Sequence, residues 1–157
     1  VNKSILIIAS ILLTAVWAFA QTDQFAKDIE ELKKLKGSQY INKAISIAEE
    51  MGLQGNYKEC LTYFDKAIDQ ATKIRNPSTG AMVVPRKAEF VTTRFPKQDE
   101  YVKSVFNSLK KAISRNDNPV VISQLSEGLV GIQPMATNQK LERDIQKELS
   151  RINNKIE

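Results

Sequence analysis

The sequence predicts an all-α protein built from antiparallel helical hairpins, and two observations support that fold class. Apolar residues recur at three- and four-residue steps over most of the chain, which is the spacing of one buried helix face. Clusters of glycine, proline and asparagine interrupt this pattern at short intervals, as turns between helices of ordinary length would. The predicted helices span residues 22–36, 39–53, 57–74, 97–115, 119–132 and 137–156.

Residues 1–20 have the features of a secretory signal peptide. Lys3 supplies a positive charge, Ser4–Ala20 contains no ionisable side chain, and the run closes on a small-residue Ala-Phe-Ala site. An uncleaved membrane anchor needs about 20 apolar residues, and this run is shorter. The sequence therefore predicts cleavage after Ala20, export to the periplasm or the cell exterior, and no stable transmembrane span after processing. A single helical domain is expected over residues 21–157.

A glycine and a serine separate the first two predicted helices. Thr22 can cap the helix 22–36, because its hydroxyl can accept a backbone N–H that has no partner within the helix. Gly37 ends that helix, and the helix 39–53 follows. The buried face expected for this second helix consists of Ile41, Ala44, Ile45, Ile47, Ala48 and Met51.

The stretch GNYKECLTYFDKAI predicts a glycine turn followed by the helix 57–74. Gly55 can adopt backbone angles that strain other residues. On the apolar face, the small residues Cys60 and Ala67 let a facing helix approach, and the rings of Tyr57 and Phe64 fill the space beside them. Because free cysteines are among the most buried residues, we interpret Cys60 as a packing residue and not as a reactive thiol.

Residues 76–96 are expected to form a loop or a small β-hairpin. They contain three prolines and two short β-branched or aromatic runs, MVV and FVTT. Long connections within a domain are often functional when present. The basic side chains of the stretch Pro85–Lys97 therefore form a candidate contact loop, alternatively a merely solvated connection: Arg86, Lys87, Arg94 and Lys97.

Three further helices complete the predicted domain. The helix 97–115 has a continuous apolar face and ends near an Asn-Asp-Asn-Pro turn. In that turn Asn118 can cap the helix 119–132 and Pro119 can occupy its first position. The last helix, 137–156, carries a narrow apolar stripe suited to packing on one neighbour.

Residues 41–74 resemble a single degenerate tetratricopeptide (TPR) repeat. The matching positions are Ala44, Ile47 and Ala48 on the first helix, Gly55 at the turn, and Tyr57, Cys60, Phe64 and Ala67 on the second helix. The sequence departs from the family where Ala44 replaces a bulky aromatic residue and where no proline closes the repeat. The resemblance implies a TPR-like or α-solenoid-like bundle whose surface binds a protein or peptide partner.

The composition argues against an enzyme, and no catalytic, cofactor-binding or metal-binding residue is predicted. The chain has no histidine, no glycine-rich phosphate loop and no Cys-x-x-Cys pair. Glu49 and Glu50 could form a carboxylate pair in a hydrolase. Since carboxylates seldom lie in protein interiors, we favour the interpretation that they are the solvated side of a helix.

Positive charge is concentrated in residues 73–115, which hold ten basic and three acidic side chains. A segment of this sign can attract an anionic polymer or a membrane surface, and this is the alternative functional hypothesis. Nucleic acid is not expected as a partner, because the tyrosines outside the predicted core are too few to form a stacking platform.

Overall fold

The computed structural model describes residues 25–74 and 77–156, and these residues are helical with no strand among them. They belong to two units, Val1–Leu35 and Lys36–Glu157. In the first unit residues 25–34 form a helix. The predicted signal peptide 1–20 and the predicted cap Thr22 lie outside the described residues.

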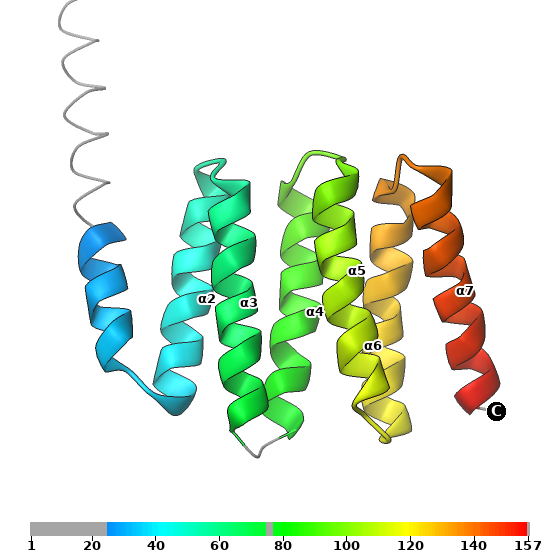
Figure 1. Ribbon diagram of the computed structural model, residues 1–157, viewed down its shortest axis with the longest axis horizontal. Helices are drawn as coiled ribbons and strands as arrows, with labels where there is room; N and C mark the ends of the chain where they lie inside the picture. Colours follow the sequence, from blue (N-terminus) through cyan, green and yellow to red (C-terminus); the bar gives the residue numbers. More distant parts are fainter. Residues whose placement is uncertain (1–24, 75–76, 157) are drawn as a thin grey trace, which may run out of the picture. The chain divides into compact units, whose positions relative to one another are not determined.

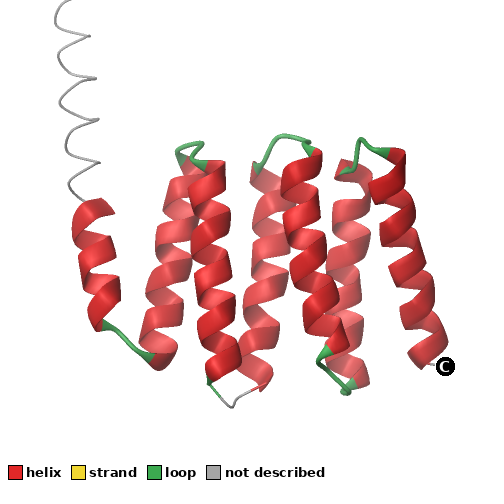
Figure 2. Ribbon diagram, viewed as in Figure 1, coloured by secondary structure: helices red, strands yellow, loops and turns green. Residues whose placement is uncertain are grey.

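The described residues of the second unit form six α-helices and one short 3-10 helix (Figure 2). The α-helices are α2 (Gly37–Leu53), α3 (Tyr57–Lys73), α4 (Pro77–Arg94), α5 (Asp99–Ser114), α6 (Pro119–Ile132) and α7 (Gln139–Ile156), and η1 (Gln133–Met135) lies between the last two.

These helices form three consecutive antiparallel hairpins, α2–α3, α4–α5 and α6–α7, stacked in two layers. Figure 1 shows α2, α4 and α6 side by side in the more distant layer and α3, α5 and α7 in the nearer one. Alternate helices contact each other within each layer, as α2 does with α4 and α4 with α6. The first helix of every hairpin therefore lies on the same side of the unit.

The turn predicted at Gly55 is confirmed. Gly55 has a φ of 82°, in the left-handed region, and its N–H bonds to the carbonyl of Gly52 at 3.1 Å. The N–H of Asn56 reaches the carbonyl of Met51 at 2.9 Å. This pair of bonds is the Schellman motif, which satisfies the last carbonyls of α2 and reverses the chain into α3.

Small and aromatic side chains pack together in this first hairpin. The small residues Ala44, Ala48, Cys60 and Ala67 are completely buried, and so is Phe64. Tyr57 is half-buried; its ring centroid lies 4.5 Å from that of Phe95 and 5.6 Å from that of Tyr101. The hairpin thus interleaves small and aromatic side chains, and the aromatic cluster continues into the next hairpin.

The prediction for residues 76–96 is wrong, because most of this segment is the helix α4. Pro77 occupies the first position of α4, where a missing N–H costs nothing, and Pro85 lies in its interior. The buried residues Val84, Ala88 and Val91 follow helical spacing. Burying Val84 and Val91 gains about 1.5–3 kcal/mol each, which together offsets the roughly 3 kcal/mol that an interior proline costs, so tertiary packing outweighs local preference.

The start of α6 agrees with the prediction. The Asn118 side chain accepts a hydrogen bond from the Val120 N–H at 3.0 Å, and Pro119 is the first residue of the helix. Apolar residues of α6 form the core against the neighbouring helices: Ile122, Leu125, Leu129 and Ile132.

Candidate functional site

An open groove of about 780 Å³ runs along the layer formed by α2, α4 and α6. Helix α4 supplies most of its lining, α2 contributes Glu49, and α6 contributes Gln124 and Glu127. The α4 residues of the groove are Met82, Pro85, Arg86, Glu89, Phe90, Thr93 and Arg94. Because each hairpin contributes its first helix, the groove exists only when the three hairpins are stacked.

An ion pair between Glu49 and Arg86 connects the first hairpin to the second within this groove. The Arg86 Nε donates to Glu49 Oε1 at 2.6 Å, and Nη2 donates to Oε2 at 2.9 Å. The hydrogen bonds to Glu49 raise the pKa of the Arg86 guanidinium. Two parallel bonds fix the relative orientation of the two groups, so the pair sets the spacing of α2 and α4 at this point.

Apolar side chains line the same groove. Met82 is 75% exposed, and the rings of Pro85 and Phe90 are half-buried. The ring of Phe90 packs against the ring of Phe64 in the interior, with 5.8 Å between the two ring centroids. The backbone of Gly52 approaches so closely that a Cβ placed there would come within 2.4 Å of Phe90 Cε1. The groove thus offers an anchored aromatic ring and, about two helical turns away along α4, a solvent-exposed thioether.

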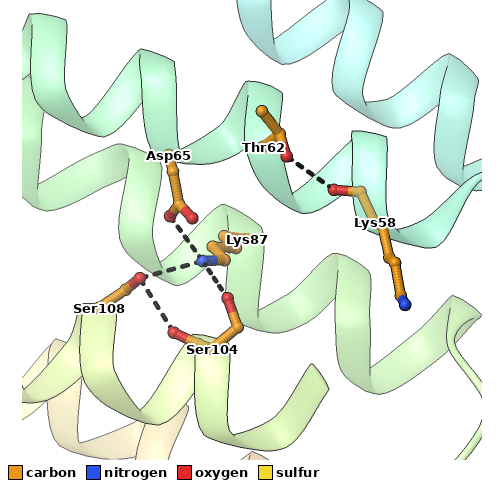
Figure 3. Close-up of polar contacts among 6 residues, drawn as sticks. All are labelled: Lys58, Thr62, Asp65, Lys87, Ser104 and Ser108. Atoms are coloured by element: carbon orange, nitrogen blue, oxygen red, sulfur yellow. Dashed lines mark hydrogen bonds and ion pairs between the residues drawn. The ribbon is translucent and has the colours of Figure 1, made fainter. Parts of the chain in front are cut away.

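Lys87 lies in the interior between α3, α4 and α5, with no exposed surface (Figure 3). Its Nζ donates to Asp65 Oδ1 at 2.7 Å and to the hydroxyls of Ser104 and Ser108 at 3.0 Å each. Ser108 in turn donates to the Ser104 carbonyl at 3.1 Å. An ammonium group has three N–H donors, and all three are satisfied here. Lys87 is therefore a buried polar connection between the first two hairpins.

The structure does not assemble the predicted contact loop. Arg86 and Arg94 lie on α4 and line the groove, and Arg86 is paired with Glu49. Lys87 is buried, so it cannot meet an external partner. Lys97 is exposed in the connection between α4 and α5. The loop assignment was wrong because the helical spacing of α4 was hidden by its prolines and by a lysine at a core position.

The other basic residues of 73–115 include a separate group on the opposite layer. Lys110 and Lys111 of α5 line a hollow of about 580 Å³ together with Arg151 of α7. Glu148, which is buried, lines the same hollow and pairs with Arg151. The basic segment therefore does not present its charges as one surface, because some are buried or paired and others are distributed over both layers.

Cys60 occupies the interior position that its spacing predicts. Its side chain is completely buried, and burial raises the pKa of the thiol to about 12. A thiol must ionise to act as a nucleophile, and this environment opposes ionisation.

The two carboxylates considered for acid–base chemistry have different surroundings. Glu49 is held by Arg86, whereas Glu50 is exposed on α2. Within the part of the chain that the structure describes, no three potential ligands among cysteine and the acidic residues gather into a metal site.

No protein-family model matches this sequence, and a search of curated proteins and of solved structures also gives no match. No helix of the described ranges 25–74 and 77–156 has the length and apolar character that crossing a membrane requires.

Sequence reasoning missed most of the groove residues. Glu89, Phe90 and Thr93 lie in the segment expected to be a loop, and Gln124 and Glu127 lie on the solvated face of α6. The available signal was the similar spacing of the hairpins, whose first helices begin at Gly37, Pro77 and Pro119.

Proposed function

We propose that this chain is a non-enzymatic, exported helical protein that binds a protein or peptide partner through a TPR-like surface. The observation that carries the proposal is the groove to which α2, α4 and α6 each contribute side chains. Repeat proteins of this kind bind partners on the extended surface that their stacked hairpins create. About three repeats are usually required for such a stack to bury its faces, and three hairpins are present.

The TPR-like character of the proposal comes from the first hairpin. Its Gly55 turn and its buried small and aromatic residues support this part of the proposal. The assignment as a binding protein and not an enzyme draws on the absence of histidine from the sequence. It also draws on the internal pairing of Glu49 with Arg86, which leaves that carboxylate less available as a general acid or base.

A photo-crosslinking experiment tests the groove as a binding surface. A photoreactive amino acid replaces Thr93, which is exposed within the groove, in the full chain expressed in its own cell envelope. The control carries the same amino acid at Glu142, which is exposed on α7 outside the groove. We expect a discrete crosslinked protein from position 93 and not from position 142. Identical products from both positions, or none from position 93, would contradict the proposal.

Binding of an anionic polymer or membrane surface is the second candidate, and the hollow between α5 and α7 favours it. Three basic side chains, Lys110, Lys111 and Arg151, line that hollow. Retention on a sulfated-polysaccharide column at low salt should fall steeply as salt is added, because salt screens charge contacts. It should fall further in the Lys110→Glu/Lys111→Glu variant. Retention that is absent, or insensitive to salt and to this variant, would exclude the candidate.

A further inference from the structure

The charges of the groove differ in sign from the charge of the chain as a whole. The sequence has a formal net charge of +5. The groove is lined by three carboxylates, Glu49, Glu89 and Glu127, and by two guanidinium groups, Arg86 and Arg94. The groove is therefore a locally acidic site on a basic protein.

The internal ion pair leaves the net charge of the lining unchanged but reduces the number of charged groups that can meet a partner. Glu49 and Arg86 bond to each other through two hydrogen bonds, so neither has its full charge available to a partner. Glu89 of α4 and Glu127 of α6 are both exposed. Glu89 is close enough to Arg86 to add a smaller contribution to the raised pKa of that guanidinium, whose main cause is the hydrogen bond to Glu49. Among the described residues that line the groove, Arg94 is the one basic side chain outside the Glu49–Arg86 pair. What remains for a ligand is two carboxylates from neighbouring helices and one guanidinium group.

The apolar residues of the groove indicate that the ligand also carries an apolar side chain. Met82 is exposed, and its flexible thioether can adapt to different apolar side chains. Phe90 is held in place by Phe64 and by the close backbone of Gly52, so its ring is a rigid contact surface. An apolar side chain placed on Phe90 would lie beside Glu89, the preceding residue of α4.

We infer that the partner's segment carries lysine or arginine next to an apolar side chain, and that Glu89 and Glu127 receive the basic group. The inference rests on the proposed function and adds the chemistry of the partner. Charge complementarity of this kind mainly sets specificity and association rate. The inferred site predicts that the protein prefers basic peptides. Its net charge of +5 would by itself favour acidic peptides, so the two expectations are opposite.

Selection from a random-sequence peptide display library on the immobilised full chain tests this inference. We expect recovered peptides to be enriched in lysine or arginine adjacent to leucine, phenylalanine or methionine. The same selection on Glu89→Lys/Glu127→Lys should lose that enrichment. The control Glu59→Lys/Glu142→Lys makes the same change of charge at exposed positions outside the groove lining and should keep it. All four side chains are exposed, so both variants should keep the wild-type circular dichroism spectrum.

The affinity of one recovered peptide, measured by fluorescence polarisation, gives the quantitative test. We expect about tenfold weaker binding by Glu89→Lys/Glu127→Lys and less than about twofold change in the control, because two exposed charge contacts are reversed only in the former. Recovered peptides that bind in the groove but are neutral or acidic would overturn the inference and leave the proposed function standing. If no recovered peptide binds more weakly to Glu89→Lys/Glu127→Lys than to the wild type, both this inference and the proposed function are overturned.

Discussion

At the scale of single residues, Lys87 is the least expected feature of the structure. A lysine is almost never completely buried unless it is paired. Here Asp65 provides the counter-charge and two serine hydroxyls complete the set of acceptors. The sequence could not identify this site, because Asp65, Ser104 and Ser108 lie 17 to 22 positions from Lys87 and come from two other helices.

The two partners of this ion pair should respond differently to mutation. Asp65→Ala leaves the buried ammonium without a counter-charge, whereas Lys87→Met removes the buried charge and keeps most of the side-chain volume. We expect Asp65→Ala to lower the free energy of unfolding by about 2 kcal/mol, less than for a fully buried pair because Asp65 is half-exposed. Lys87→Met should cost less than about 1 kcal/mol. Urea titration followed by circular dichroism measures both.

The double variant Asp65→Ala/Lys87→Met is the control for this prediction. It should recover most of the stability lost in Asp65→Ala, because no unpaired buried charge remains. A double variant less stable than Asp65→Ala would show that the ammonium is not the source of the loss.

The stability of the protein should also depend on pH through Lys87. Burial lowers the pKa of its ammonium below the ordinary value of 10.5, and Asp65 opposes that shift. Between the lowered pKa and 10.5 the unfolded chain binds more protons than the folded one, so the free energy of unfolding contributed by Lys87 rises with pH. Below the lowered pKa the full cost of burying the charge remains.

The comparison of the wild type with Lys87→Met isolates this effect from the other titrating groups. We expect the free energy of unfolding of the wild type to rise relative to that of Lys87→Met as the pH rises toward 10.5. Denaturant titrations of both proteins across the alkaline range measure it. A difference that is constant, or that moves in favour of Lys87→Met, would contradict the prediction.

At the scale of helices, periodicity predicted most elements to within a few residues. The helices expected at 39–53, 57–74 and 119–132 correspond to α2, α3 and α6. The failure was α4, where Pro85 and Lys87 obscured an apolar face that otherwise follows helical spacing. Its burial against α3, α5 and α6 stabilises the helix, and those long-range contacts are not visible in local sequence.

Two glycines within helices should have opposite effects when replaced by alanine. At Gly131 a Cβ would lie 3.8 Å from Thr92 Cγ2, which is an ordinary contact. Gly131→Ala should therefore raise the free energy of unfolding by about 0.5–1 kcal/mol through helix propensity. At Gly52 a Cβ would meet Phe90 Cε1 at 2.4 Å, so Gly52→Ala must displace the ring and should destabilise the protein.

Thermal unfolding of the two variants measures this contrast, and Gly131→Ala serves as the control for the general effect of alanine in a helix. A melting temperature that rises equally in both variants would mean that α2 and α4 do not approach closely at Gly52.

At the scale of the whole unit, the groove is a consequence of stacking. One hairpin could be recognised from the sequence because its turn and its small and aromatic residues are local features. The groove could not be predicted, because its lining comes from helices that begin about 40 residues apart, at Gly37, Pro77 and Pro119. Stacking places every first helix in one layer, and the proposed binding surface depends on that arrangement.

The nuclear Overhauser effects between adjacent first helices are the most direct test of this arrangement. We predict a cross-peak between the Phe90 ring and Gly52, joining α4 to α2. A second cross-peak should join the Ala88 methyl group to Gly128, where a Cβ would lie 3.5 Å from that of Ala88, and so join α4 to α6. Finding both would establish the common layer. Absence of both, in a folded protein with assigned resonances, would contradict the stacked hairpins and the groove that they form.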